Sequence, residues 1–280
     1  MFKRACLLAT AALMTTMASC STASSTSSAT MPPSPAKEVF IEREVLVDGT
    51  SHRYRVFVPA AKKAGKRPVI VFLHGSGERG DDNRKQVTVG LGPYVEKHAD
   101  DFPAIVVFPQ APLDSEWHDN LAMTLAAMDA ATREFGGDPD RTYLTGMSMG
   151  GYGTWDFALR EPHRFAALVP VCGGIVGPDR RPSLQVSAVA GLADPFTETA
   201  RRLRDVPVWI FHGARDDLVP PEQSRRMAAA LKAAGSEDAR YTEFPDANHN
   251  SWDPAYSQTP ELWTWLFAQS LRPETHATGR

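Results

Sequence analysis

Cysteine is scarce in this sequence, with three among 280 residues. Cys6 and Cys20 lie near the amino terminus, which leaves Cys172 as the only thiol in the body of the chain. If Cys20 is lipidated or removed, no intrachain disulfide can form, and the fold must be held by its core. Cys172 follows an apolar run, from Ala166 to Val171, and is therefore expected to be a buried, inert residue at the end of a strand.

An excess of charge of one sign is also lacking. The chain has 30 Lys and Arg against 33 Asp and Glu, a formal net charge of −3, which gives no reason to expect nucleic acid as the main partner. The sequence contains neither His-Glu-x-x-His nor paired Cys-x-x-Cys, so it predicts no metal site and no cofactor. A hydrophobic content of 42% is ordinary for a globular protein and allows a sizeable core.

The amino-terminal apolar run, from Ala5 to Met14, is too short to span a bilayer. It follows two basic residues and precedes small ones, which is the layout of a secretory signal, predicted here over residues 1–20. The segment Met17-Ala-Ser-Cys20 resembles a bacterial lipobox with methionine in place of the usual leucine. We therefore predict an exported protein, anchored to a bacterial envelope by a lipid on Cys20. Ordinary signal cleavage, giving a periplasmic or secreted protein, is the alternative.

Three further segments are expected after the signal. Residues 21–36 are almost entirely Ser, Thr, Ala and Pro, which cannot bury enough apolar surface to order themselves and so predict a flexible tether. Residues 37–272 contain no second linker and no internal repeat, which indicates one globular domain. Residues 273–280 form a polar tail.

The domain opens with the pattern of a hairpin. Two alternating stretches, Val39–Val47 and His52–Val58, are joined by Asp48-Gly49. Asp-Gly between two such stretches is typical of a tight turn between antiparallel strands. We therefore expect an antiparallel hairpin at this end of the domain.

The rest of the domain alternates between short apolar runs and helix-like segments. The runs are apolar on both faces, as in a buried parallel sheet, and they cover residues 69–73, 104–108, 142–145, 166–171 and 208–211. The helix-like segments cover residues 121–135, 149–160, 222–234 and 260–271. This alternation predicts an α/β fold, with a mostly parallel central sheet, helices on both faces and the hairpin as an antiparallel edge.

The segment Gly146-Met-Ser148-Met-Gly150 fits the pattern G-x-S-x-G. A predicted strand over residues 141–145 precedes it and a predicted helix follows, so Ser148 lies on a sharp strand-to-helix turn that needs glycine on both sides. The start of the helix directs free N–H groups at the serine oxygen, where negative charge develops. We predict that Ser148 is a catalytic nucleophile. A glycine-rich turn with an incidental serine is the alternative.

A serine nucleophile needs a base, and this motif predicts the chain order Ser, then Asp or Glu, then His. Only His249 and His276 follow a plausible acid, and His276 lies in the polar tail. His249 lies in a loop after the predicted strand 241–244, and it is the predicted base. Two neighbouring acids, Asp216 and Asp217, follow a buried strand. They cannot both face the base, and the residue pattern leaves both open.

The loop Leu73-His-Gly-Ser-Gly77 is expected to supply one N–H group of an oxyanion hole, and Met149 the other. The overlapping segment Gly75–Gly80 also fits G-x-G-x-x-G, a dinucleotide-binding pattern. That pattern should open directly into a helix and have an acid at the end of the next strand. Here a charged loop over residues 81–85 follows, and the next strand ends at Gln110, so we expect no nicotinamide cofactor.

Five segments together resemble the secreted carboxylesterase and predicted-peptidase branch of the α/β hydrolases. This branch lies near polyhydroxybutyrate depolymerase-like and feruloyl esterase-like proteins and, more distantly, the prolyl oligopeptidase catalytic domain. The segments are LHGSGERG at 73–80, FPQAP at 108–112, GMSMGGYGTW at 146–155, FHGARDDLVP at 211–220 and NHNSW at 248–252.

The resemblance implies an α/β-hydrolase fold over residues 39–271, and it aligns the catalytic acid with Asp216. It also implies that Ser76 supplies the oxyanion N–H group of its loop. Trp117 and Trp252 would lie near the acyl or alcohol group of the substrate, with packing in the core or at its rim as the alternative.

Together these features predict a serine carboxylesterase that forms an acyl-enzyme at Ser148. Its substrates would be small or polymer-borne esters, such as short-chain, feruloyl or acetyl-sugar esters. Only about 30 residues separate Gly173 from Asp205, so we expect no large cap domain and an open site. Two alternatives stay open: a serine peptidase of the prolyl oligopeptidase type, and a surface binding module on a non-catalytic hydrolase scaffold.

Overall fold

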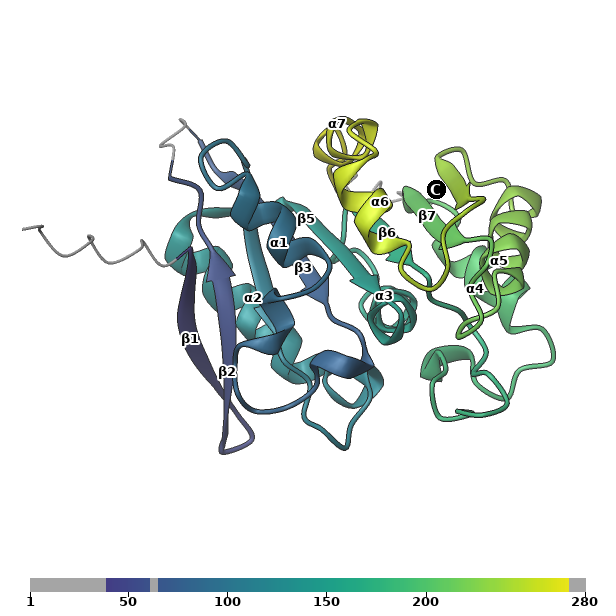
Figure 1. Ribbon diagram of the computed structural model, residues 1–280, viewed down its shortest axis with the longest axis horizontal. Helices are drawn as coiled ribbons and strands as arrows, with labels where there is room; N and C mark the ends of the chain where they lie inside the picture. Colours follow the sequence, from purple (N-terminus) through teal and green to yellow (C-terminus); the bar gives the residue numbers. More distant parts are fainter. Residues whose placement is uncertain (1–38, 61–64, 272–280) are drawn as a thin grey trace, which may run out of the picture. The chain divides into compact units, whose positions relative to one another are not determined.

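An eight-stranded sheet runs through the part of the chain that the computed structural model describes, residues 39–60 and 65–271 (Figure 1). The strand order is β1-β2-β4-β3-β5-β6-β7-β8. The strands are β1 (Phe40–Val47), β2 (Thr50–Phe57), β3 (Arg67–Leu73), β4 (Ile105–Pro109), β5 (Gly137–Met147), β6 (Ala167–Val171), β7 (Val208–Gly213) and β8 (Ala239–Phe244).

The predictions for the two ends of the chain lie outside the described residues. They are the signal over residues 1–20 with Cys20, the tether over residues 21–36, and the tail over residues 273–280 with His276. The described residues all fall in one compact unit. Within them, no helix is both long enough and apolar enough to cross a bilayer.

The predicted hairpin forms the antiparallel edge of the sheet. Strands β1 and β2 pair along their whole length, with Val47 opposite Thr50. The two turn residues, Asp48 and Gly49, have φ values of 49° and 78°. Two positive φ values in a two-residue turn are what a type I′ hairpin requires, which explains the Asp-Gly pair. Strand β2 pairs antiparallel with β4, and all other strand pairs are parallel, so the predicted sheet is confirmed.

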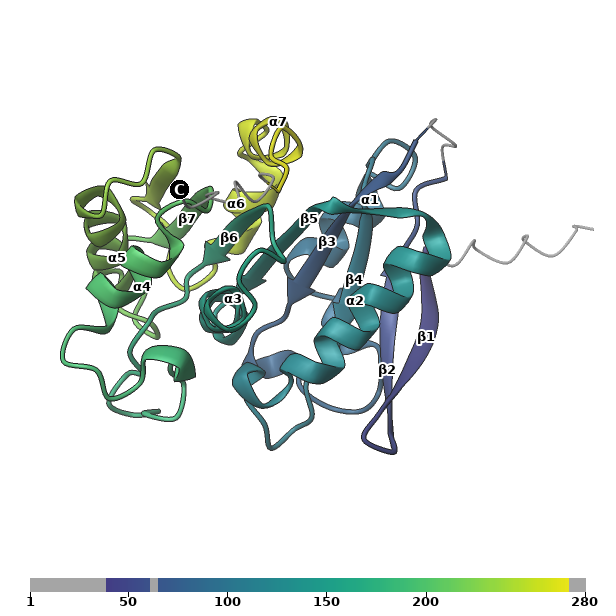
Figure 2. The same cartoon turned by 180° about the vertical axis from the view of Figure 1, so that it is seen from behind.

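Helices cover both faces of the sheet (Figures 1 and 2). They are α1 (Leu91–Lys97), α2 (Leu121–Phe135), α3 (Met149–Arg160), α4 (Pro195–Leu203), α5 (Glu222–Ala233), α6 (Trp252–Ser257) and α7 (Glu261–Phe267). In β3, Val71 and Leu73 belong to a core cluster with residues of α2 to α5, whereas Ile70 and Phe72 belong to one with residues of α1, α6 and α7. A strand covered on both faces needs apolar residues at every position, which explains the continuous apolar runs.

Helix α4 lies in the segment where a cap domain was predicted to be absent. Its Phe196, Ala200 and Leu203 are buried in the same core cluster as residues of α3 and α5. Asp194 caps the helix, since its Oδ1 accepts the Thr197 N–H at 3.2 Å. The helix is therefore part of the scaffold, and the described residues contain no large cap.

Candidate active site

Ser148 lies on the tight turn between β5 and α3. Its φ of 54° is in the region that residues other than glycine rarely adopt. Its neighbours leave no room for side chains: a Cβ at Gly146 would lie 2.3 Å from the Gly150 carbonyl oxygen, and a Cβ at Gly150 would lie 1.9 Å from that of Leu73. The Ser148 N–H donates to the Val171 carbonyl at 2.9 Å and anchors the turn to the neighbouring strand.

The side chains predicted from chain order meet at this turn. Ser148 Oγ lies 2.9 Å from His249 Nε2, and His249 Nδ1 lies 2.7 Å from Asp216 Oδ2. An ionised carboxylate can only accept, so Nδ1 carries the ring proton and Nε2 is free to accept from the serine hydroxyl. These residues come from the β5–α3 turn, the loop after β7 and the loop after β8. The arrangement can move a proton from Ser148 to His249 while Asp216 stabilises the charged ring.

Asp216, and not its neighbour, faces the histidine. The Asp216 side chain is fully buried, and its Oδ1 accepts the N–H groups of Leu218 and Val219 at 2.8 and 2.9 Å. These two bonds orient the carboxylate so that Oδ2 points at His249. Asp217 is exposed at the surface, as expected for neighbours that face apart.

A second histidine, His212, also contacts the acid. Its Nε2 lies 3.1 Å from Asp216 Oδ2 and 3.0 Å from the Val219 carbonyl oxygen, and its Nδ1 lies 2.7 Å from Ser224 Oγ. Burial opposes ionisation of Asp216, but hydrogen bonds from His212, His249 and the Val219 amide outweigh it and hold the pKa of Asp216 well below its usual range. Chain order excluded His212 as the base, and no sequence pattern indicated this contact.

Each of the two predicted oxyanion donors is the first residue of a helix. Met149 is the first residue of α3, so the helix does not use its N–H group. Ser76 begins the 3₁₀ helix η1 (Ser76–Glu78), in the loop after β3. This loop lies close to the turn at Ser148, since a Cβ at Gly75 would lie 3.7 Å from Ser148 Cβ. Both residues are therefore proposed as oxyanion donors.

His74 holds the oxyanion loop in place. Its Nε2 accepts the Ala111 N–H at 3.0 Å, so Nδ1 carries the proton and donates to the Gly75 carbonyl at 2.6 Å. Burial lowers the pKa of His74 to about 4, which keeps the ring neutral near pH 7.

Trp117 lies beneath this loop and not at the substrate. It is 1% exposed, its Nε1 donates to the His74 carbonyl at 2.9 Å, and its ring meets the His74 ring edge-on. The structure thus corrects its predicted contact with the substrate in favour of the packing alternative. A tryptophan in a loop fits either role, and only the fold separates them.

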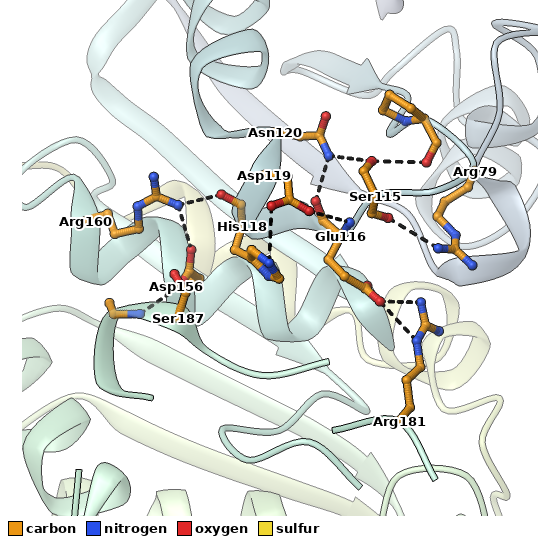
Figure 3. Close-up of polar contacts among 12 residues, drawn as sticks. Arg79, Ser115, Glu116, His118, Asp119, Asn120, Asp156, Arg160, Arg181 and Ser187 are labelled. Atoms are coloured by element: carbon orange, nitrogen blue, oxygen red, sulfur yellow. Dashed lines mark hydrogen bonds and ion pairs between the residues drawn. The ribbon is translucent and has the colours of Figure 1, made fainter. Parts of the chain in front are cut away.

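Two arginines fix Ser76 to neighbouring segments. Arg79 donates from Nε to the Ser76 carbonyl at 3.1 Å and from Nη1 to the Ser115 carbonyl at 3.3 Å. Arg181 donates from Nη1 to Ser76 Oγ at 2.5 Å, and from Nε and Nη2 to Glu116 Oε1 at 3.1 and 2.6 Å. Figure 3 shows the Arg79–Ser115 and Arg181–Glu116 contacts, which the two arginines make to neighbouring residues of one loop. The segment between β6 and α4 is thereby tied to the oxyanion loop.

A cavity of about 330 Å³ opens at Ser148 and His249. Apolar side chains form much of its wall, namely Met147, Leu184, Leu218, Val219 and Trp252, and the charged side chains that line it are Glu78, Arg180 and Arg181. Trp252 lines this cavity and meets the His249 ring edge-on at 5.6 Å, and its contact with a substrate stays a prediction. The volume is at the small end for ligand pockets and suits a small acyl or alcohol group.

One group of three potential metal ligands occurs among the described residues: Cys172, Asp216 and His249, whose ligand atoms lie within 4.8 Å of one another. Cys172 is fully buried directly after β6, as predicted, and burial raises the pKa of its thiol. The other two side chains are bonded to each other. The group therefore fits proton transfer better than metal binding, and the absence of a cofactor stays a prediction.

Comparison with known proteins places the chain among hydrolases. The profile of the prolyl oligopeptidase family matches residues 188–270. A poly(3-hydroxyoctanoate) depolymerase of Pseudomonas fluorescens is 28% identical over 201 residues, which cover 64% of this chain and 67% of the depolymerase. The chain spans between 10% and 67% of the length of such curated relatives.

Solved structures agree with this placement. The crystal structure of a thermostable esterase matches with a TM-score of 0.66 and 32% identity, over 83% of this chain and 63% of the esterase. An acylaminoacyl peptidase of Pyrococcus horikoshii shares the fold at 18% identity, with a TM-score of 0.63 over 85% of this chain and 43% of the peptidase. The chain therefore has the α/β-hydrolase fold, and the proteins to which it is similar include esterases and peptidases.

Proposed function

We propose that the chain is a serine carboxylesterase that acts through an acyl-enzyme at Ser148. The observation that carries this proposal is the unbroken hydrogen-bond path from Ser148 Oγ through His249 to Asp216, at 2.9 and 2.7 Å. The Ser148 end of this path opens into the cavity, which residues of the oxyanion loop also line. A non-catalytic binding module has no use for such a path.

The first half of the reaction forms the acyl-enzyme. Ser148 Oγ attacks the ester carbonyl carbon while His249 Nε2 takes the hydroxyl proton. The carbonyl oxygen gains negative charge, which the N–H groups of Met149 and Ser76 stabilise. When the tetrahedral intermediate collapses, the carbon–oxygen bond to the alcohol breaks, and His249 gives its proton to the leaving alcohol oxygen.

The second half releases the acid. Water takes the place of the alcohol, and His249 removes one of its protons as the water oxygen attacks the acyl carbon. Collapse of this second intermediate breaks the bond to Ser148 Oγ, which regains its proton from His249. Asp216 stays ionised throughout, since the hydrogen bonds that it accepts keep its pKa low.

Amide hydrolysis is the second candidate, because the matched family profile is that of the prolyl oligopeptidases. The charges around the cavity favour the ester. A peptide amino group needs a carboxylate anchor, and Glu78 is the one carboxylate among the described residues that line the cavity. Burial raises the pKa of Glu78, and Arg180 and Arg181 lie on the same cavity. This setting disfavours an ammonium group.

Small or exposed esters fit the site best. The poly(3-hydroxyoctanoate) depolymerase among the relatives is named for an ester polymer, and a ferulic acid esterase shares the fold. Short-chain, feruloyl and acetyl-sugar esters are therefore the substrates to test. The predicted signal, and a relative named as a secreted protein, support action outside the cytoplasm, with or without a lipid on Cys20.

The test compares matched esters and amides. We expect p-nitrophenyl acetate and butyrate to be hydrolysed, and the corresponding p-nitroanilides to be hydrolysed far more slowly. Ser148→Ala should lower kcat by at least about 10⁴-fold. Ser257→Ala, which alters an exposed serine on α6, is the matched control and should hydrolyse esters like the wild type. Equal ester hydrolysis by Ser148→Ala would refute the proposal, and a preference for anilides would favour the peptidase.

A further inference from the structure

His212 is a fully buried imidazole that the reaction described above does not use. It is the fifth residue of β7, and Asp216 lies in the loop that follows this strand. Its ring lies between the catalytic acid on one side and Ser224 of α5 on the other. A buried ring with polar contacts at both nitrogens is held in one orientation.

The position of one proton on this ring follows from its neighbours. His212 Nε2 faces Asp216 Oδ2 at 3.1 Å and the Val219 carbonyl oxygen at 3.0 Å, and both of these atoms are acceptors. Nε2 therefore carries a hydrogen and donates to them. Asp216 Oδ2 thus receives two imidazole N–H groups, one from His212 and one from His249.

The two oxygens of Asp216 are held in different ways. Oδ1 is fixed by two backbone N–H groups of its own loop. Oδ2 is held only by side chains, and of these His249 changes its charge during the reaction. His212 is the one partner of Oδ2 that stays in place while His249 gains and loses a proton.

We propose that His212 is a positioning residue for the reaction, which keeps Asp216 Oδ2 aimed at His249 and shares the negative charge of that oxygen. The proposal rests on the proposed function, because it assigns His249 the role of base. The site would then be a chain of four side chains, from Ser148 through His249 and Asp216 to His212.

Other titratable groups near these four side chains do not take the place of His212 as a donor to Asp216. Burial raises the pKa of Tyr152 on α3 and of Cys172 after β6, so both stay neutral over the working range. Glu243 on β8 faces His212 and is already bonded to Arg225 and Tyr241. Glu78, Arg180 and Arg181 line the cavity on the substrate side. Arg215 and Asp246, on the loops that carry Asp216 and His249, are exposed and paired with each other.

Two substitutions separate charge sharing from simple packing. His212→Leu removes the N–H donor, whereas His212→Gln can present an amide N–H near the position of Nε2. We expect His212→Leu to lower kcat roughly ten- to hundredfold with little change in KM, as for loss of a hydrogen bond to a charged group. We expect His212→Gln to restore most of the loss.

The pH profile of kcat/KM gives the direction of the effect of His212 on the reaction. Without the second donor, Asp216 Oδ2 attracts the His249 proton more strongly, so the acid limb of kcat/KM should move to higher pH in His212→Leu. Thr199→Val is the control, because it also replaces a buried polar group, on α4 away from the site, and should leave the limb in place. An acid limb that stays in place or moves to lower pH in His212→Leu would overturn the proposal, as would equal losses in the Leu and Gln variants.

A readout without substrate distinguishes failure of this proposal from failure of the proposed function. The Nδ1 proton of His249 should give a low-field proton NMR signal that is absent in His249→Gln. We expect the signal to move further downfield in His212→Leu, because the remaining bond to Oδ2 strengthens. An unchanged signal would refute charge sharing even if the chain hydrolysed no ester. Absence of ester hydrolysis in the wild type would instead refute the proposed function.

Discussion

At the scale of the residue, three histidines of the site differ in their surroundings. The His249 side chain is 16% exposed and lies between Ser148 and Asp216. His212 is fully buried against the same acid, and His74 is a fully buried residue of the oxyanion loop. Only His249 reaches the cavity, so only this ring can exchange a proton with a substrate.

The burial of His74 predicts a loss of stability in acid. Burial lowers the pKa of His74 to about 4, whereas the unfolded chain has a value near 6.5. Between these values the unfolded state binds more protons, so the free energy of unfolding falls as the pH falls. The contribution is fully present above about pH 6.5, and about 2–3 kcal/mol of it should be lost by pH 4.5.

Urea unfolding at pH 7.0 and pH 4.5 measures this loss. His74→Gln should show a clearly smaller difference between the two pH values than the wild type. His118→Gln changes a histidine that is partly exposed, and it should keep the wild-type difference. If His74→Gln lost as much stability in acid as the wild type, the buried ring would not be the cause.

The sequence predicts the residues proposed to react but not the residues that hold them in place. Ser148 has a local motif, and chain order isolates His249. His212 and Arg181 have no local motif, because their roles depend on loops that meet only in the folded chain. The choice of Asp216 came from resemblance, and the backbone N–H groups that orient its carboxylate are the physical reason for it.

At the scale of the element, the turn between β5 and α3 depends on backbone packing. A Cβ at Gly150 would lie 1.9 Å from the Leu73 carbonyl oxygen, and backbone atoms cannot move aside without breaking the strand. We expect Gly150→Ala to lower the free energy of unfolding by at least about 3 kcal/mol. Gly77→Ala is the control: it lies on the neighbouring loop, where a Cβ would meet nothing within 4 Å.

Thermal and urea unfolding of both variants test this expectation. Gly77→Ala should unfold within about 0.5 kcal/mol of the wild type, since open space receives the new methyl group. A Gly150→Ala variant as stable as Gly77→Ala would mean that the turn relaxes freely. The tight contact would then not explain why glycine is needed there.

The sequence predicts long or strongly patterned elements better than short ones. Helices α2 and α3 have the predicted bounds: α2 is long and ends just before Gly136, and α3 begins directly after the G-x-S-x-G serine and is buried from Met149 to Leu159. Helices α1 and α6 are seven and six residues long, and each contains a proline, so they show little periodicity. Helix α4 has a pattern that could have predicted it, an Asp-Pro start followed by apolar residues at positions 196, 200 and 203. The charged residues between these positions make the pattern hard to recognise in the sequence.

At the scale of the whole molecule, the sheet explains why distant residues meet. The proposed nucleophile, acid and base follow the carboxyl ends of β5, β7 and β8, and the proposed oxyanion loop follows that of β3. These four strands run parallel, with β6 between β5 and β7, so their carboxyl ends lie at one edge of the sheet, where α/β proteins bind their ligands. The mostly parallel topology that the apolar runs predicted is thus also what assembles the site.

The most direct test of the account is the reaction of the chain with a fluorophosphonate, with the adduct located by peptide mass spectrometry. We predict one adduct, on Ser148, in the wild type. Asp216→Asn should slow its formation by roughly 10⁴-fold, whereas the neighbouring Asp217→Asn should react like the wild type. An adduct on another serine, or equal rates for the two asparagine variants, would contradict the proposed roles of Ser148 and Asp216.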